Sequence, residues 1–329
     1  MNTKPRDELY CGVNKEKILS SEPKINPENY SHLIHFMKER FMIHIKKDVL
    51  KESAPWTDDP VLQSYRFTNV FREDDFVTKA LIECAQSSYL SYEEKVLNTV
   101  LFRAWNNPDT FRIFWGPWKA EAIYDSDKLK KHIRPLFRKL SEQDQDRLWF
   151  SAAYNQGGTK RACQCRNLDG TGEYEPDIPL RIFHIGAWMK ELDFVNEVTN
   201  AANQKEAFEK IRAIRGFAEF LAYQVFVDLT YIPEFPFSEN EFVIAGPGCK
   251  KGLDYIFQDP AGLSYSEQLF KLRDYLKEES DLVQLFEEHG KTINVMSVEN
   301  CMCEISKYIR AVNGTGRPRN HYKPRKEVQ

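Results

Sequence analysis

The chain has 329 residues, of which 42% are hydrophobic and 13% aromatic, a composition that supports a large core and excludes an intrinsically disordered protein. Its formal net charge of -3 excludes a strongly basic protein, although a near-neutral total can hide a local basic face. The seven cysteines lack disulfide-framework spacing, and we find no secretory leader and no run of 18 apolar residues. We therefore expect a cytoplasmic protein with no membrane span.

In chain order, the first predicted feature is a polar, loosely ordered lead over residues 1–29, followed by an amphipathic helix over residues 30–51. Asp59 suits an N-cap and Pro60 the first helical position, which predicts a second helix over residues 59–87. Apolar periodicity predicts further helices at 92–106, 127–139, 142–155, 180–200, 204–215, 218–231, 264–278, 281–289 and 297–312. The best strand signal is at 241–245. We expect an all-α body over residues 30–312 and a basic tail over residues 313–329.

The predicted helix at 59–87 carries charges on its apolar face. At about 100° per residue, Arg66, Glu73 and Asp74 fall among the apolar positions, whereas Arg72 and Asp75 turn toward solvent. A buried charge needs a partner, so one interpretation pairs Arg66 with Glu73 or with an acid from another helix. The alternative is a polar cleft in which Arg66 and Asn69 meet an anionic ligand, with Trp56, Asp58 and Asp59 at its mouth.

Two segments have the form of sites in which backbone N–H groups bind an anion. Residues 204–231 have the outline of a helix-hairpin-helix, in which the turn at Gly216 would present N–H groups to a DNA phosphate, although Ala218 stands where a second glycine is usual. Gly246-Pro247-Gly248, followed by Lys250 and Lys251, would let a phosphate or carboxylate approach the start of another helix. An ordinary helical hairpin and an ordinary turn are the alternatives. No GxxxxGK[ST] loop occurs, so nucleotide triphosphate hydrolysis is not supported.

The C-terminal tail is basic, with tyrosines among residues that include Arg317, Arg319 and Lys323. That pattern fits an arm that follows a nucleic-acid backbone, and a merely solubilising tail is the alternative. The Cys163/Cys165 and Cys301/Cys303 pairs are CxC motifs without a histidine at helical spacing, so we expect no metal site, and no motif predicts a cofactor.

Several blocks together resemble a known family. They are Pro55-Trp-Thr-Asp-Asp-Pro60, Tyr65-Arg-Phe-Thr-Asn-Val-Phe-Arg72, Asp75, the Gly246-Pro247-Gly248 turn with Gly252, Cys303-Glu304 and Lys307-Tyr308. Over residues 30–323 the chain resembles the phage-centred alpha-glutamyl/putrescinyl-thymine pyrophosphorylase-like proteins, or amino acid:DNA transferases, which share the helical domain of 5-hydroxymethyluracil DNA kinases. The resemblance implies a fold similar to helix-hairpin-helix DNA glycosylases, and thymine hypermodification in DNA as the activity.

In such a reaction an amine replaces the phosphate or diphosphate on a base that is flipped out of DNA. The expected partners are therefore DNA, a small amine or amino acid, and a DNA kinase that prepares the substrate. We expect Arg66 and Arg72 to hold the leaving group and Asp58, Asp59 or Asp75 to act as base, with Asn69 in the same catalytic group. Expected substrate contacts are Trp56, Gly246, Pro247, Gly248, Lys250, Lys251, Lys307 and Tyr308, and expected DNA contacts are Gly216, Arg317, Arg319 and Lys323.

Two other functions stay open at this point. Glycosylases carry an aspartate soon after the hairpin, but this chain has Ile244-Ala-Gly-Pro-Gly248 there, which favours transfer over base excision. The second alternative is a non-catalytic DNA-binding partner of a DNA kinase.

Overall fold

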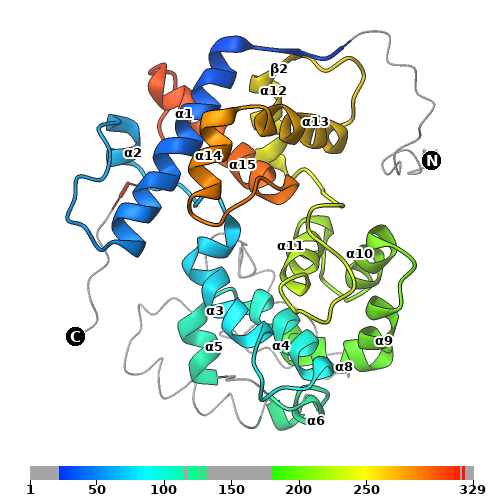
Figure 1. Cartoon of the computed structure of the whole chain (residues 1–329). Helices are drawn as coiled ribbons and strands as arrows, with labels where there is room; N and C mark the ends of the chain where they lie inside the picture. The colour runs from blue at the N-terminus through cyan, green and yellow to red at the C-terminus, as the bar shows by residue number, and fades with distance from the viewer. Residues whose placement is uncertain are drawn as a thin grey trace.

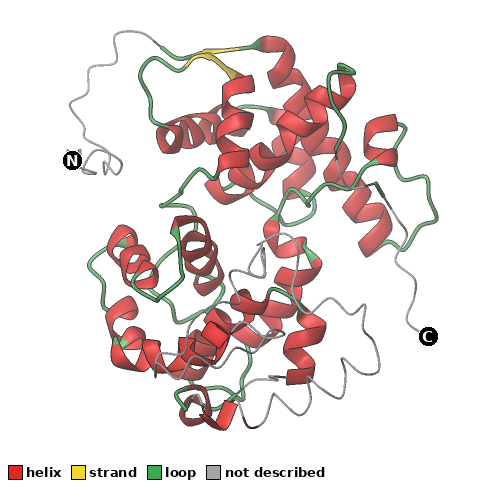
Figure 2. Cartoon of the chain, turned by 180° about the vertical axis from the view of Figure 1, so that it is seen from behind, coloured by secondary structure: helices red, strands yellow, loops and turns green. Residues whose placement is uncertain are grey.

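A computed structural model of the chain describes residues 22–114, 118–125, 127–129, 131, 180–318 and 321–322. The prediction of an all-α fold is confirmed, because helices form nearly all of the regular structure in this part of the chain (Figure 2). The described strands are β1 (Lys24–Ile25) and β2 (Phe257–Asp259), which pair antiparallel. The strand predicted at 241–245 is wrong, since that segment is irregular. No helix in the described part is long and apolar enough to cross a membrane.

The helices form two groups, and the first contains both ends of the described chain (Figure 1). It comprises α1 (Pro27–His44), which the π-helix η1 (Ile45–Val49) continues, α2 (Pro60–Ser64), α12 (Pro247–Ile256), α13 (Tyr265–Lys277), α14 (Ser280–Glu287) and α15 (Val295–Val312). Most were predicted to within a few residues. Ser264 and Asn294 begin α13 and α15 with capping boxes, which satisfy free backbone amides at the helix start.

The second group occupies the lower half of Figure 1 and is built around α4. It comprises α3 (Phe76–Ala85), α4 (Tyr92–Trp105), α5 (Pro108–Phe114), α6 (Ala120–Ile123), α8 (Leu180–Glu191), α9 (Phe194–Thr199), α10 (Gln204–Arg212) and α11 (Glu219–Leu229). The helix predicted at 180–200 breaks at Asp193, which has a φ of 46°. The helix predicted at 142–155, and nearly all of the one at 127–139, lie outside the described residues.

The chain passes between the two groups at two places that are distant in sequence. The 3-10 turn η2 (Arg72–Asp74) contacts α15 in the first group and α3 in the second. The irregular segment after α11 returns the chain to α12 through Ile244 and Gly246. Side chains on η2 and at the start of α12 therefore lie at the junction of the groups.

Helices α12 and α15 make the most extensive contact in the first group, and Gly252 allows it. A Cβ added to Gly252 would overlap the main-chain carbonyl of Met302 on α15. Because a backbone carbonyl cannot move aside as a flexible side chain can, this position excludes any larger residue.

We expect Gly252→Ala to lower the free energy of unfolding by about 2 kcal/mol or more, because the added methyl group forces the two helices apart. Urea unfolding would measure this loss. Gly248→Ala is the matched control on the same helix, because its Cβ would meet Cys303 at an ordinary 3.5 Å. If the two variants are equally stable, the close approach of the helices does not depend on Gly252.

Candidate functional site

The helix predicted at 59–87 is wrong in its length but right in its start. The Asp59 side chain caps α2 by accepting hydrogen bonds from the Val61 and Leu62 amides at 2.8 and 3.0 Å. The helix ends after Ser64, and Tyr65 becomes extended, with φ -123° and ψ 150°. A β-bridge from Tyr65 to His321 holds this extended segment beside the C-terminal arm.

The prediction of which charged residues face the core, made from helical angles, is therefore also wrong. Arg66 is exposed, whereas Arg72 is buried with 5% of its surface exposed. Glu73 pairs with Lys291 at 2.9 Å, so the predicted pair of Arg66 with Glu73 does not form. Arg66 has no ion-pair partner among the described residues.

Arg72 belongs to a buried ionic network. Its guanidinium donates to Asp228 Oδ1 at 2.7 Å and to the side chain of Gln224. Arg103 donates to both oxygens of the same carboxylate, at 2.5 and 2.7 Å. Asp228 is fully buried, so the two arginines compensate its charge in the core of the second group. This network fixes η2 to α4 and α11, and it commits the Arg72 guanidinium to Asp228 and Gln224.

Asp59 is likewise committed to the fold. Beyond the two helix amides, its Oδ2 accepts from the Tyr308 hydroxyl at 2.6 Å and lies 3.0 Å from His35 Nε2. Burial opposes ionisation, but these hydrogen bonds outweigh it and hold the pKa of Asp59 below its ordinary value. A carboxylate of lowered pKa is a poor proton acceptor. Neighbouring Asp58 is exposed.

Trp56 lies with the C-terminal arm. Its ring is 5.8 Å from that of Tyr322, and Lys47 Nζ lies 5.3 and 5.0 Å from the two ring centroids. The Tyr322 amide donates to the Ser64 carbonyl, which fastens the arm to the end of α2. Arg317 is exposed, and Arg319 and Lys323 lie outside the described residues.

The face of α15 toward the junction carries a polar stripe. It consists of Glu299, Asn300, Cys303, Glu304 and Lys307, and we call it the α15 stripe. These positions fall within one arc of a helix at 100° per residue. Asn300, Cys303 and Lys307 are partly exposed, whereas Glu299 and Glu304 are 2% and 7% exposed. The partly exposed side chains thus have a buried acid on either flank.

The glycine turn before α12 lies along one edge of the stripe. A Cβ on Gly246 would be 3.7 Å from Glu299 Oε1, and one on Gly248 would be 3.5 Å from the Cys303 main chain. Gly246 also lies beside Phe220, which is 39% exposed and belongs to the first turn of α11. The glycine turn and the α10–α11 hairpin, whose Gly216 has a φ of 83°, therefore meet at the junction.

Asn69, Asp75 and Arg40 lie along the other edge. Asn300 on the stripe donates to the Asn69 carbonyl at 2.5 Å, and the Asn69 amide donates to Asp75 Oδ1 at 3.1 Å. Arg40 on α1 donates to the Phe67 carbonyl at 3.4 Å. Asp75 precedes α3 but makes no capping bond to it, so its carboxylate is directed to the Asn69 segment instead.

Burial shifts the acids of this site toward their protonated forms. It raises the pKa of Glu299 to about 7, against the hydrogen bond from Cys303, the charge of Arg72 and the Gly246 amide. Burial also raises the pKa of Asp75, against the Asn69 amide and the charges of Arg40 and Arg72. The pKa of Glu304 is raised by burial although Lys307 lies 2.8 Å away. Such shifted carboxyl groups are frequent at functional sites.

Glu299 makes stability depend on pH in a definite direction. Because its folded pKa is raised from 4.5 to about 7, its contribution is complete below the unfolded pKa and is lost as pH rises through the folded value. In the parent, the free energy of unfolding should fall by roughly 3 kcal/mol between about pH 4.5 and pH 8 as Glu299 ionises. We expect Glu299→Gln to lack this fall, because glutamine does not ionise. Urea unfolding across this range would test it, and an unchanged slope would contradict it.

Thus the structure brings Asn69, Asp75, Gly246, Gly248 and Lys307 together at the junction. Other predicted residues lie elsewhere: Asp58, Asp59, Trp56 and Tyr308 near α2, Arg72 in the core, and Lys250 beside Tyr265, with Pro247 and Lys251 exposed. Sequence reasoning missed Arg40, Glu299 and Asn300. Glu299 and Asn300 could have been found from the sequence, because polar residues recur at helical spacing among the apolar residues of α15.

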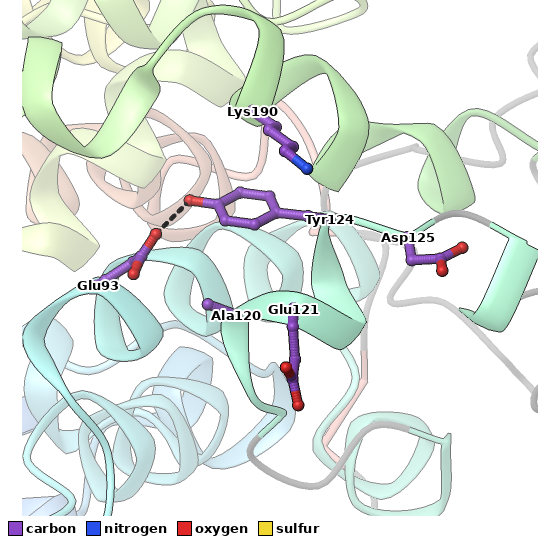
Figure 3. Close-up of a pocket in the computed structure, with 6 residues that line it drawn as sticks. All are labelled: Glu93, Ala120, Glu121, Tyr124, Asp125 and Lys190. Carbon is purple, nitrogen blue, oxygen red and sulfur yellow. Dashed lines mark hydrogen bonds between the residues drawn. The ribbon is translucent and has the colours of Figure 1, made fainter.

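A cavity of about 580 Å³ lies away from this junction, between α4, α6 and α8 (Figure 3). Glu93, Glu121 and Asp125 line it with Lys190, whose Nζ is 5.8 Å from the Tyr124 ring. The Tyr124 hydroxyl donates to Glu93 at 2.6 Å. With three carboxylates against one ammonium group, this cavity repels phosphate and does not suit the predicted ligand.

Comparison with known proteins agrees with the resemblance seen in the sequence. The family model for the helical domain of 5-hmdU DNA kinase matches residues 28–317. The chain belongs to this family. A 5-hmdU DNA kinase of Bacillus phage SP10 is 30% identical over 286 residues, which are 82% of this chain and 43% of that protein. The helical-domain chain thus spans less than half of that relative. No solved structure matches this chain.

Proposed function

We propose that this chain modifies 5-hydroxymethyluracil in DNA by transferring the amine of an amino acid or polyamine onto the phosphorylated hydroxymethyl group. Membership of the 5-hmdU DNA kinase helical-domain family supports 5-hydroxymethyluracil as the base that is modified. The kinase activity in the relative's name is not carried over, because the match covers 43% of that protein and these 329 residues contain no GxxxxGK[ST] loop.

The observation that carries the proposal is the position of Asp75. Of the three aspartates that the sequence offered as base, Asp59 is saturated with hydrogen bonds and Asp58 is exposed, whereas Asp75 lies at the junction with a raised pKa. A raised pKa makes a carboxylate a stronger proton acceptor. Asp75 also adjoins Arg40, whose charge favours its ionised form.

The step is a substitution at the exocyclic carbon. The amine nitrogen forms a bond to that carbon while the carbon–oxygen bond breaks, and its electron pair leaves with the phosphate. Asp75 accepts the proton that the nitrogen loses. Arg66 is exposed near Arg40, and Lys307 lies on the α15 stripe, so these cations would stabilise the departing phosphate. The glycine turn and the hairpin turn would contact the DNA backbone.

Nucleoside mass spectrometry tests this function directly. The protein would be incubated with DNA that carries phosphorylated 5-hydroxymethyluracil, together with a pool of amino acids and polyamines. We expect a new amino-substituted thymidine and free phosphate or diphosphate. An abasic site would show excision instead, and unchanged nucleosides with retained binding would show a non-catalytic partner of a DNA kinase. Either of these results would overturn the transfer proposal.

A further inference from the structure

Asn69 is held through its backbone and its side-chain Nδ2, but its Oδ1 is unused. Its Nδ2 donates to the Asp74 carbonyl at 2.8 Å, which fixes the amide so that Oδ1 is the remaining oxygen. The residue is 7% exposed, and Oδ1 is buried without a hydrogen-bond partner among the described residues. A fixed, buried acceptor without a donor destabilises the fold, so it needs an explanation.

Arg40 has a complementary unused atom. Its Nε donates to the Phe67 carbonyl, and its Nη1 is buried without a partner in the described part of the chain. Phe67 is two residues before Asn69, and the charges of Arg40 and Asp75 act on one another. The lone acceptor of Asn69 and the lone donor of Arg40 therefore belong to the same site around Asp75.

A ligand that satisfies both atoms must offer a hydrogen-bond donor and an acceptor side by side. The imide edge of uracil and thymine has this pattern, with N3–H between two carbonyl groups. Cytosine presents a bare N3 and an amino group, so it would set acceptor against acceptor and donor against donor. An unpaired site group discriminates strongly between such analogues.

We propose that Asn69 and Arg40 read the imide edge of a flipped uracil-type base, with Asn69 Oδ1 accepting from N3–H and Arg40 Nη1 donating to the O4 carbonyl, the position that carries the amino group in cytosine. This inference rests on the proposed function, because it assigns residues to recognition of the base that is modified. It makes Asn69 a specificity-determining residue. Asp75 then stands next to the bound base, since it already holds the Asn69 amide.

Equilibrium binding to single-stranded oligonucleotides tests the assignment without requiring catalysis. One oligonucleotide carries 5-hydroxymethyluracil and the other 5-hydroxymethylcytosine at the same position. We expect the parent to prefer the uracil base by about tenfold or more. Asn69→Leu should abolish this preference, whereas Asn69→Asp should keep it, because a carboxylate still accepts from N3–H.

Both variants lose the bond from Nδ2 to the Asp74 carbonyl, so that loss does not account for a difference between them, and thermal denaturation would confirm that each is folded. Thr68→Ala, at the exposed neighbouring position, is a control that should keep the parent's preference. Equal preference in Asn69→Leu and the parent would overturn the inference, for instance if Oδ1 binds only water. Base selectivity that depends on Asn69, without amine transfer, would support the inference and reject the proposed function. Amine transfer without base selectivity that depends on Asn69 would support the proposed function and reject the inference.

Discussion

Replacing Asp75 with asparagine should lower the rate of amine transfer by about 10²- to 10⁴-fold, the range typical for loss of a general base. Asparagine keeps an oxygen that can accept from the Asn69 amide, so the local structure should persist. Single-turnover kinetics on DNA with the phosphorylated base would measure the effect. Asp109→Asn, at an exposed aspartate on α5, is the matched control and should leave the rate unchanged.

The same substitution should not lower stability. Burial raises the pKa of Asp75, so its contribution to stability is present below the unfolded pKa and is lost as pH rises through the folded value. Asparagine removes this loss, and the thermal midpoint of Asp75→Asn at neutral pH should equal or exceed that of the parent. A slower and less stable variant would instead indicate a structural role for the carboxylate.

Asp228→Ala should produce the largest loss of stability, about 3–5 kcal/mol, because it leaves Arg72 and Arg103 buried without their shared carboxylate. Urea unfolding would measure the change. Glu209→Ala is the matched control on α10, because it removes a solvent-exposed partner of Arg212 and should change stability little. If both variants unfold at the same urea concentration, the buried network does not stabilise the fold.

Loss of Asp228 should also slow the reaction, because Arg72 begins the η2 turn that precedes Asp75. The effect on rate should exceed any effect of Glu209→Ala when both proteins are assayed folded. A folded Asp228→Ala protein with the parent's rate would show that the bond from Arg72 to Asp228 is not needed to hold η2 in place.

The segment around Arg66 shows how far sequence periodicity can be trusted. Leu62, Val70 and Val77 fit a helical face, but Phe67 and Asn69 are buried while Arg66 and Thr68 are exposed, which is the alternation of an extended chain. Over a short segment both patterns fit the same apolar residues. No glycine or proline marks the break after Ser64, because the chain leaves the helix to pair with the C-terminal arm.

The family resemblance identified the helical domain correctly, and the amine-transfer specialisation stays a proposal. Of the predicted site residues, Asn69, Asp75, Gly246, Gly248 and Lys307 meet at the junction, but Arg72 and Asp59 serve the fold. A motif groups residues that are close in sequence. It does not show which of them are turned inward.

By itself, the sequence determined what depends on neighbours along the chain: the helical class, the Asp59 cap with Pro60, and the helix that carries the α15 stripe. The tertiary structure decided which charges are buried and which share a site. Arg72 meets Asp228 across 156 residues, and Asn300 meets Asn69 across 231. Such partners are selected by the packing of helices that are distant in sequence, and local periodicity contains no information about them.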